Sequence, residues 1–173
     1  ERINVPAEGD LAVTAVNIEE NAGREPVNYV LPPGVTRIVD SGQSQITQLN
    51  EQSMSMKVTQ LPAGASRAVY KNTSLDLRIY RRLQMFLHNE ALIDDATSLR
   101  DGEVSAFIRL GSDVKNNYYE YEIPLSVTPP KSNYSTYSSS DQYAVWPEAN
   151  MLDCDLDVFT TVKKNRNAQK LQG

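Results

Sequence analysis

Few residues of this chain could perform covalent chemistry. His88 is the only histidine and Cys154 the only cysteine, so a Ser-His-Asp or Cys-His mechanism would have to use one of them. His88 lies in an alternating run and is most simply a structural histidine. Asp153 and Asp155 flank Cys154 and should raise the pKa of its thiol, which lowers its nucleophilicity. We therefore expect no enzyme and no catalytic residue.

Acidic side chains offer a second chemistry, metal binding or glycoside hydrolysis. Loop aspartates next to strands can hold calcium; they are Asp94, Asp95, Asp101 and Asp113. They lack EF-hand spacing, so solvated turns are the simpler interpretation, and one histidine with one cysteine disfavours zinc. A carboxylate pair among Glu103, Glu120 and Glu122 stays open, although the last two would share a solvent-facing strand face. We predict no metal and no cofactor.

Aromatic and basic side chains instead favour binding. Aromatic groups on a sheet face or loop stack on sugars or contact proteins, and an arginine cluster could pair with Asp76, with the acidic 90–103 segment or with another domain. The predicted contact residues are Tyr118, Tyr119, Tyr121, Tyr134, Tyr137, Trp146, Arg78, Arg81 and Arg82, with Tyr143 beside them. Burial of Tyr119 and Tyr121 in a core is the competing interpretation. Net charge −5 and pI 4.9 argue against nucleic acid as a partner.

The clearest structural pattern is a pair of strands over residues 103–125. In each strand alternate apolar or tyrosine residues share one face; these are Val104, Ala106, Ile108 and Leu110, then Tyr119, Tyr121, Ile123 and Leu125. Phe107 breaks the polarity of the opposite face. Polar and glycine residues at 111–117 permit a reversal. The pattern predicts a β-hairpin.

Other short runs predict a mainly β fold. Extended segments are expected at 11–18, 27–31, 35–40, 51–60, 65–71, 74–80 and 83–88, with a helix as the competing prediction for 74–80. Pro32-Pro33-Gly34 predicts a sharp turn. Leu156, Phe159 and Val162 recur at helical spacing after Asp153 or Asp155, either of which could be the N-cap. About eight strands favour an antiparallel β-sandwich of jelly-roll or galactose-binding type with a short C-terminal helix.

One domain is expected over residues 1–165. Within it, the Ser/Thr/Tyr/Pro-rich stretch 128–142 is typical of a long mobile loop or a crossover, and residues 166–173 are expected to be a tail or linker that continues the basic run from Lys163. The single cysteine allows no internal disulfide. No run has the apolar length of a transmembrane helix, so we do not expect this chain to span a membrane.

Several stretches resemble the SprA (Sov) family of gliding-motility and secretion proteins of Bacteroidota. The matching segments are VNYVLPPGVTR at 27–37, QLNEQSMSMKV at 48–58, RAVYKNTSLDLRIYRRLQMFLHNEAL at 67–92, DGEVSAFIRLGSDVKNNYYEYEIPL at 101–125 and VWPEANMLD at 145–153. Their order and spacing are similar to a repeat domain in the N-terminal portion of that family. The resemblance covers nearly the whole chain, and the 101–125 segment is its most specific part.

The resemblance implies a role in protein secretion. The family forms the outer-membrane translocon of the type IX secretion system, a very large β-barrel that exports folded cargo. Its partners include an outer-membrane shuttle protein and a plug protein, and it has no catalytic residues to carry over. This chain lacks aromatic girdles and repeated membrane-length strands. The resemblance therefore implies a soluble extracytoplasmic part of the translocon, on either the periplasmic or the surface side.

The expected function is a non-catalytic cap or docking module of the translocon. It would contact the rest of the same chain, the shuttle and plug proteins, or secreted cargo, through the tyrosines at 118–121 and the loop at 132–143. The alternative is a carbohydrate-binding β-sandwich module of a surface protein, which predicts exposed aromatics and saturable polysaccharide binding. A hydrolase would instead require clustered acids of raised pKa in a cleft.

Overall fold

The chain forms two compact units, each built from two separate stretches of sequence. The computed structural model describes residues 9–37, 39–40, 47–48, 51–74, 76–95, 98–113 and 115–170. Unit 1 takes its residues from 1–22 and 36–74, and unit 2 takes its residues from 23–35 and 75–173. The chain therefore enters unit 2, returns to unit 1 and then completes unit 2.

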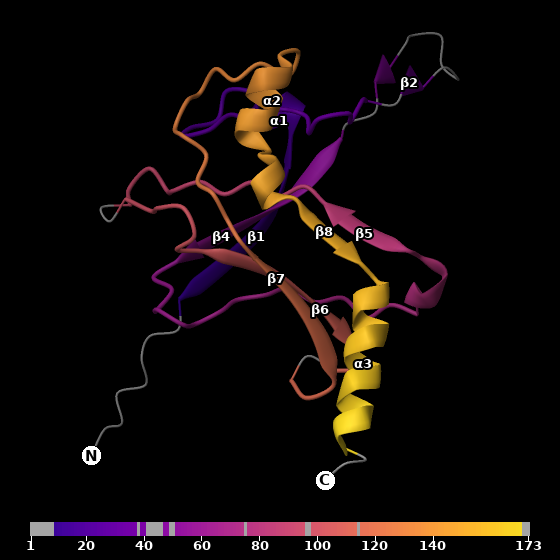
Figure 1. Cartoon of the computed structure of the whole chain (residues 1–173). Helices are drawn as coiled ribbons and strands as arrows, with labels where there is room; N and C mark the ends of the chain where they lie inside the picture. Colours follow the sequence, from indigo (N-terminus) through magenta and orange to yellow (C-terminus); the bar gives the residue numbers. More distant parts are fainter. Residues whose placement is uncertain are drawn as a thin grey trace, which may run out of the picture. The chain divides into compact units, whose positions relative to one another are not determined.

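Unit 1 contains a two-stranded antiparallel ribbon (Figure 1). Its strands are β1 (Asp10–Asn17) and β4 (Gln52–Thr59), which pair over their whole length. Helix α1 (Ile18–Asn21) follows β1 directly, and the Asn17 side chain caps it by accepting a 2.9 Å hydrogen bond from the Glu20 N–H. The short strands β2 (Val39–Asp40) and β3 (Thr47–Gln48) pair with each other. The predicted strands at 11–18 and 51–60 are confirmed.

One face of the β1–β4 ribbon is apolar. Directly paired residues lie on the same face of a sheet, and the pairs on this face are Leu11 with Val58, Val13 with Met56 and Ala15 with Met54. Val13, Met54 and Met56 are 44, 59 and 38% exposed. Unit 1 therefore presents large apolar side chains to its surroundings rather than burying them between its own strands.

Unit 2 contains the predicted hairpin. Strands β6 (Ser105–Gly111) and β7 (Tyr118–Pro124) pair antiparallel. Their register places Ala106 opposite Ile123, Ile108 opposite Tyr121 and Leu110 opposite Tyr119. The two apolar faces inferred separately from each strand are therefore one continuous face of the hairpin.

The opposite hairpin face explains why Phe107 interrupts a polar row. The Arg109 guanidinium lies 5.0 Å from the Phe107 ring centroid and 4.3 Å from that of Tyr118, and it also pairs with Glu120. The turn is closed by Asp113, whose carboxylate accepts hydrogen bonds from the backbone of Asn116 and Lys115 and the side chain of Asn117. The Asn116 bond is the largest of the causes that lower the Asp113 pKa to about 2.

A second ladder joins distant parts of the sequence. Strand β5 (Arg82–Met85) pairs antiparallel with β8 (Leu152–Asp155). Alternation in β8 buries Leu152 and Cys154, which are 0 and 1% exposed, while Asp153 and Asp155 face outward. The strand predicted at 83–88 is thus confirmed in its first part.

The C-terminal helix is longer than the pattern predicted. Helix α3 (Asp157–Lys170) includes most of the basic stretch that we expected to fray. Asp155 Oδ1 accepts a 3.0 Å hydrogen bond from the N–H of Asp157, the first residue of the helix, so of the two predicted N-cap candidates Asp155 is the one that contacts the first turn. Phe159 packs on Tyr119 with ring centroids 5.5 Å apart, and this contact places α3 beside the hairpin (Figure 1).

The core of unit 2 gathers around residues 27–31. The buried apolar residues are Val27, Tyr29, Val30, Leu31, Leu125, Tyr134, Val145, Trp146, Leu152 and Cys154. The 27–31 segment was predicted as a strand, but it makes only one isolated bridge, from Val27 to Lys131. Side chains satisfy its backbone instead: the Trp146 indole N–H donates to the Val30 carbonyl at 2.9 Å and the Leu31 N–H donates to Thr136 Oγ1 at 3.0 Å.

Two buried asparagines act in the place of strand neighbours. Asn28 donates to the Tyr134 carbonyl at 2.9 Å and accepts from the Tyr134 N–H at 2.8 Å. Asn150 makes the same pair of bonds to the backbone of Ser126, at 2.8 and 2.7 Å. Each amide satisfies a backbone donor and a backbone acceptor of one residue, so the backbone needs no sheet there.

The 128–142 stretch is anchored at several points. Tyr134 is buried and its hydroxyl donates to the Pro129 carbonyl. Helix α2 (Ser139–Val145) begins within the stretch, where the Ser138 hydroxyl accepts from the Asp141 N–H. Tyr137, by contrast, is 97% exposed, the largest exposure among the described large hydrophobic residues. The loop was predicted as mobile and carries a helix in its second half.

The overall architecture is mainly β, but it differs from the predicted sandwich. The described strands pair in four separate two-stranded antiparallel ladders rather than in two larger facing sheets, and two of the eight strands have only two residues. No strand forms in the described part of 65–71 or 76–80; a 3₁₀ turn, Leu77–Ile79, occupies the second. Leu75 and most of 41–50 lie outside the described residues.

Candidate binding sites

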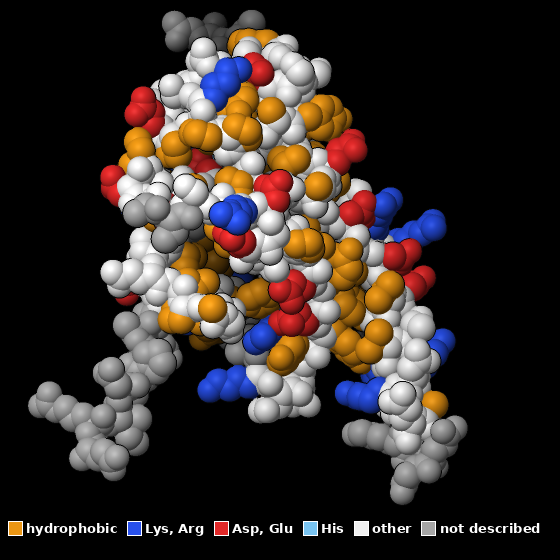
Figure 2. All heavy atoms as spheres, turned by 60° about the vertical axis from the view of Figure 1, so that its left-hand side comes forward, with side chains coloured by type: hydrophobic (Ala, Val, Ile, Leu, Met, Phe, Trp, Pro, Cys, Tyr) orange, Lys and Arg blue, Asp and Glu red, His pale blue; other side chains and the backbone are white. Residues whose placement is uncertain are grey.

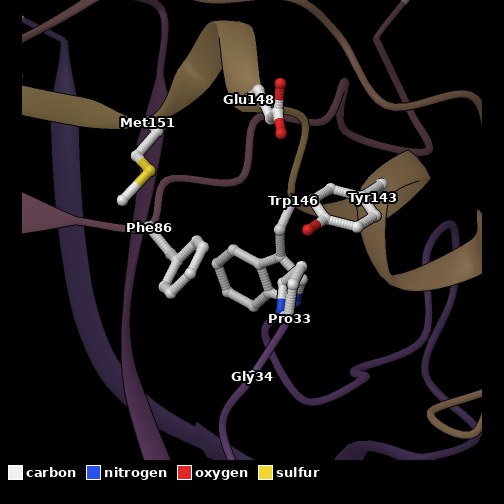
Figure 3. A pocket seen from close by; sticks show the side chains of 7 residues that line it. All are labelled: Pro33, Gly34, Phe86, Tyr143, Trp146, Glu148 and Met151. Atoms are coloured by element: carbon white, nitrogen blue, oxygen red, sulfur yellow. The ribbon is translucent and has the colours of Figure 1, made fainter. Parts of the chain in front are cut away.

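An aromatic pocket lies on the surface of unit 2 (Figure 3). Its residues are Pro33, Gly34, Phe86, Tyr143, Trp146, Glu148 and Met151, and its volume is about 290 Å³. The sharp turn predicted at 32–34 forms one edge: the Val35 N–H donates to the Pro32 carbonyl, and Gly34 has φ +76°, which suits glycine in this turn. Helix α2 supplies Tyr143, and the 3₁₀ turn Glu148–Asn150 supplies Glu148.

Trp146 forms the floor of this pocket and joins it to the core. It is 7% exposed and meets Tyr29 and Phe86 edge to face, with ring centroids 6.2 and 6.5 Å apart. Phe86 and Tyr143 lie on the two sides of the indole in Figure 3. Because the indole N–H is bonded to Val30, the ring is fixed in one orientation.

His88 packs against Trp146, and its ring nitrogens are held by neighbouring groups, as expected for a structural histidine. Its ring centroid is 5.8 Å from that of Trp146, and its Nδ1 lies 2.9 Å from the Val145 carbonyl oxygen. Its Nε2 lies 3.1 Å from Glu90, a carboxylate that also pairs with Arg24. Burial lowers the pKa of His88 and the charge of Arg24 acts in the same direction, against the opposing effect of the Val145 hydrogen bond.

A second hollow, the arginine cleft, lies along β5 and β8. Its residues are Arg81, Arg82, Asp153 and Asp155, and its volume is about 510 Å³. Arg82 makes a two-point ion pair with Asp153, to which the Gln84 amide also donates. The hydrogen bond from Arg82 is the main cause that lowers the pKa of Asp153. Arg82 thus pairs across the β5–β8 ladder with Asp153. The side chain of Arg78, the third arginine of the predicted cluster, lies outside the described residues.

The predicted tyrosines fall into different environments. Tyr118, Tyr119 and Tyr121 are half-buried: the first contacts Arg109, the second packs on Phe159, and the Tyr121 hydroxyl donates to the Asp153 carbonyl at 3.2 Å. Tyr134 and Trp146 are buried and Tyr137 is exposed. The structure therefore brings Trp146 into the pocket and Arg81 and Arg82 into the cleft, but it does not gather the nine predicted residues into one site.

Cys154 lies beneath the arginine cleft. It is buried, and burial raises the pKa of its thiol more than the charges of Asp155 and Asp153 do. The sequence identified the two flanking carboxylates as a cause of the raised pKa, but it did not identify burial, which is the larger cause. Among the described residues, no group of three or more His, Cys, Asp or Glu side chains could hold a metal ion.

Sequence reasoning missed most of the aromatic pocket. Phe86, Met151, Glu148 and Pro33 come from three regions of the chain and meet only in the fold. The sole local signal was the Trp146-Pro147-Glu148 sequence, in which the proline ends α2 and turns Glu148 to the rim. Within the residues described, none of the helices has both the length and the apolar character needed to cross a membrane.

Comparison with known proteins identifies a family. The family model SprA_N, described as a motility related/secretion protein, matches residues 2–172. No curated protein matches the chain.

Proposed function

The chain belongs to the SprA_N family of motility-related secretion proteins, and on that premise we propose that it is a non-catalytic docking module of an outer-membrane secretion translocon. The observation that carries the proposal is the extent of the family match, which covers residues 2–172. In this proposal the module serves type IX secretion and gliding motility in Bacteroidota. It acts outside the cytoplasm as a cap or contact surface for the rest of the translocon, for its shuttle and plug proteins, or for cargo.

The surface of the chain supports this proposal. Figure 2 shows exposed apolar side chains next to acidic and basic ones, a composition that suits a moderately polar protein interface. Val13, Met54 and Met56 in unit 1 and Tyr137 in unit 2 add large apolar groups that are at least 38% exposed. Single exposed apolar residues are ordinary, but a row on one strand pair favours a contact surface.

The decisive experiment removes the module from its translocon. In-frame deletion of residues 2–172 should abolish secretion of cargo into the medium and spreading on agar, with the shortened protein still present in the membrane by immunoblot. Normal secretion and spreading in that strain would contradict the proposal. A glycan array with the purified chain tests the carbohydrate-binding alternative, which requires saturable binding to a polysaccharide.

A point variant then tests the loop. Truncating the whole 132–143 loop would remove the buried Tyr134, so Tyr137→Ala is the sharper change: Tyr137 is 97% exposed and its loss should leave the fold intact. We expect reduced secretion because the side chain would be lost from an interface. The matched control is Tyr70→Ala, at a residue of unit 1 that is 77% exposed. Equal secretion by both variants and the parent would exclude Tyr137 as a contact.

A further inference from the structure

The aromatic pocket combines three rings with one acid. Phe86 and Trp146 meet at 69°, so their rings form two walls of a corner, and Tyr143 stands on the other side of the indole (Figure 3). Tyr143 is 47% exposed, so part of its ring is open to a ligand. Aromatic rings carry negative potential on their faces and attract cations there. The walls therefore favour a group that is apolar along its length and positive at its end.

The charge of the pocket points the same way. Glu148 is the only charged residue among those that line it, and it is exposed at the rim. Its carboxylate makes no hydrogen bond or ion pair within the described part of the chain, whereas Asp141 pairs with Lys131 and Glu90 with Arg24. Behind the indole, His88 has a lowered pKa, so it does not oppose a cation at neutral pH. The pocket thus has an acid for which the described residues supply no basic partner.

The size of the pocket limits what can enter. Sites for drug-sized molecules measure about 300–1,000 Å³, and this pocket, at about 290 Å³, lies at the lower end of that range. A pocket of this size suits a single long side chain whose terminal group lies near Glu148. Met151 adds a flexible thioether that can adjust to a methylene chain.

We propose that this pocket receives the lysine or arginine side chain of a partner protein segment, with its methylenes against the rings and its charge beside Glu148. The proposal rests on the docking function and specifies its chemistry. The partner would be a protein with an exposed basic residue that meets an acidic chain of net charge −5. Trp146 and Phe86 would contact the methylenes, and the Tyr143 ring and the Glu148 carboxylate would attract the positive terminal group.

The pocket contains its own reporter, because Trp146 is the only tryptophan of the chain. The purified chain is titrated with acetylated, amidated Gly-Gly-Xaa-Gly-Gly peptides, in which Xaa is lysine, arginine or norleucine, and tryptophan fluorescence is recorded. We expect a saturable change with lysine or arginine and an affinity at least fivefold weaker with norleucine, which has a similar chain but no charge. Comparison of the two basic peptides identifies the preferred cation. Equal affinity for norleucine would overturn the proposal, because the pocket would then be only an apolar anchor.

Two variants assign the effect to residues. Glu148→Gln should weaken binding of the basic peptide about fivefold or more, while Glu122→Gln, an exposed acid on β7, should not. Tyr143→Phe should bind like the parent and Tyr143→Leu should bind more weakly, because only the first keeps the ring. Unchanged affinity in Glu148→Gln and Tyr143→Leu would overturn the assignment. These measurements use purified protein, so their failure would leave the secretion test of residues 2–172 unaffected.

Discussion

The aromatic pocket and the arginine cleft both lie in unit 2, but they differ in whether their charged side chains are paired with one another. In the cleft, Arg82 and Asp153 satisfy each other and the Gln84 amide adds a further bond. In the pocket, Glu148 has no such partner among the described residues, and the walls are rings. A self-paired site must break its ion pair before it binds a charged ligand, so the smaller pocket is the better binding candidate even though the cleft contains more charge.

The two hollows also differ in how they relate to the core. The pocket floor is Trp146, which is itself a core residue. The cleft lies on the outward face of β8, whose inward residues Leu152 and Cys154 are buried. Changes in the floor of the pocket should therefore alter stability strongly, and changes among the cleft charges should not.

The largest expected effect is at the pocket floor. Trp146→Ala removes a buried indole, its hydrogen bond to Val30 and three ring contacts, and it should lower the free energy of unfolding by about 3–5 kcal/mol. Urea unfolding followed by circular dichroism measures this change without the lost fluorophore. Tyr137→Ala is the control and should change stability by less than about 0.5 kcal/mol. A similar loss in both variants would contradict the assignment of Trp146 to the core.

An intermediate effect is expected beneath the cleft. Cys154→Ser keeps the size of the side chain but buries a hydroxyl where the thiol packs, and it should cost about 1–3 kcal/mol in the same assay. Cys154→Ala, which adds no polar group, separates the cost of the hydroxyl from the cost of lost volume. Wild-type stability in Cys154→Ser would show that β8 is not packed as described.

The smallest effect is expected in the cleft itself. Arg82→Ala breaks an ion pair in which Arg82 is 60% exposed, so the urea midpoint should change by less than in either variant above. Sodium chloride at about 1 M should reduce whatever difference remains, because salt screens exposed charges. A midpoint shift as large as that of Trp146→Ala would contradict the claim that the cleft charges contribute less to stability than the pocket floor.

The sequence predicted the local elements well. Alternation identified β4, β6 and β7, because in each of these strands polar and apolar residues occupy opposite faces, and an apolar, β-compatible run identified β1. The sharp turn at 32–34 followed from Pro33 and Gly34 alone. These features depend on neighbours in the sequence, which is the information that a single chain supplies.

The arrangement of these elements in the fold could not be predicted from the local sequence pattern. Residues 27–31 have the composition of a strand, but Trp146 and Thr136 bond to that backbone from more than a hundred residues away. The Asn28 side chain in turn bonds to the equally distant backbone of Tyr134. The sandwich was inferred from the number of strands, and strand number does not determine which strands pair. Trp146 was predicted as a partner or ligand contact, but its place in the core could not be predicted, because burial of an indole depends on a carbonyl that its N–H meets only in the fold.

The alternating course of the chain between the two units has a consequence for synthesis. The core segment 27–31 leaves the ribosome early, but its packing partners at 125–154 follow about a hundred residues later, after the second stretch of unit 1. Contacts that span so much sequence form slowly, because the intervening loop must close first. Chains that end before Leu152 should therefore lack a closed core and be digested readily by proteases. A nascent chain would therefore remain pliable in this region until synthesis has passed Leu152.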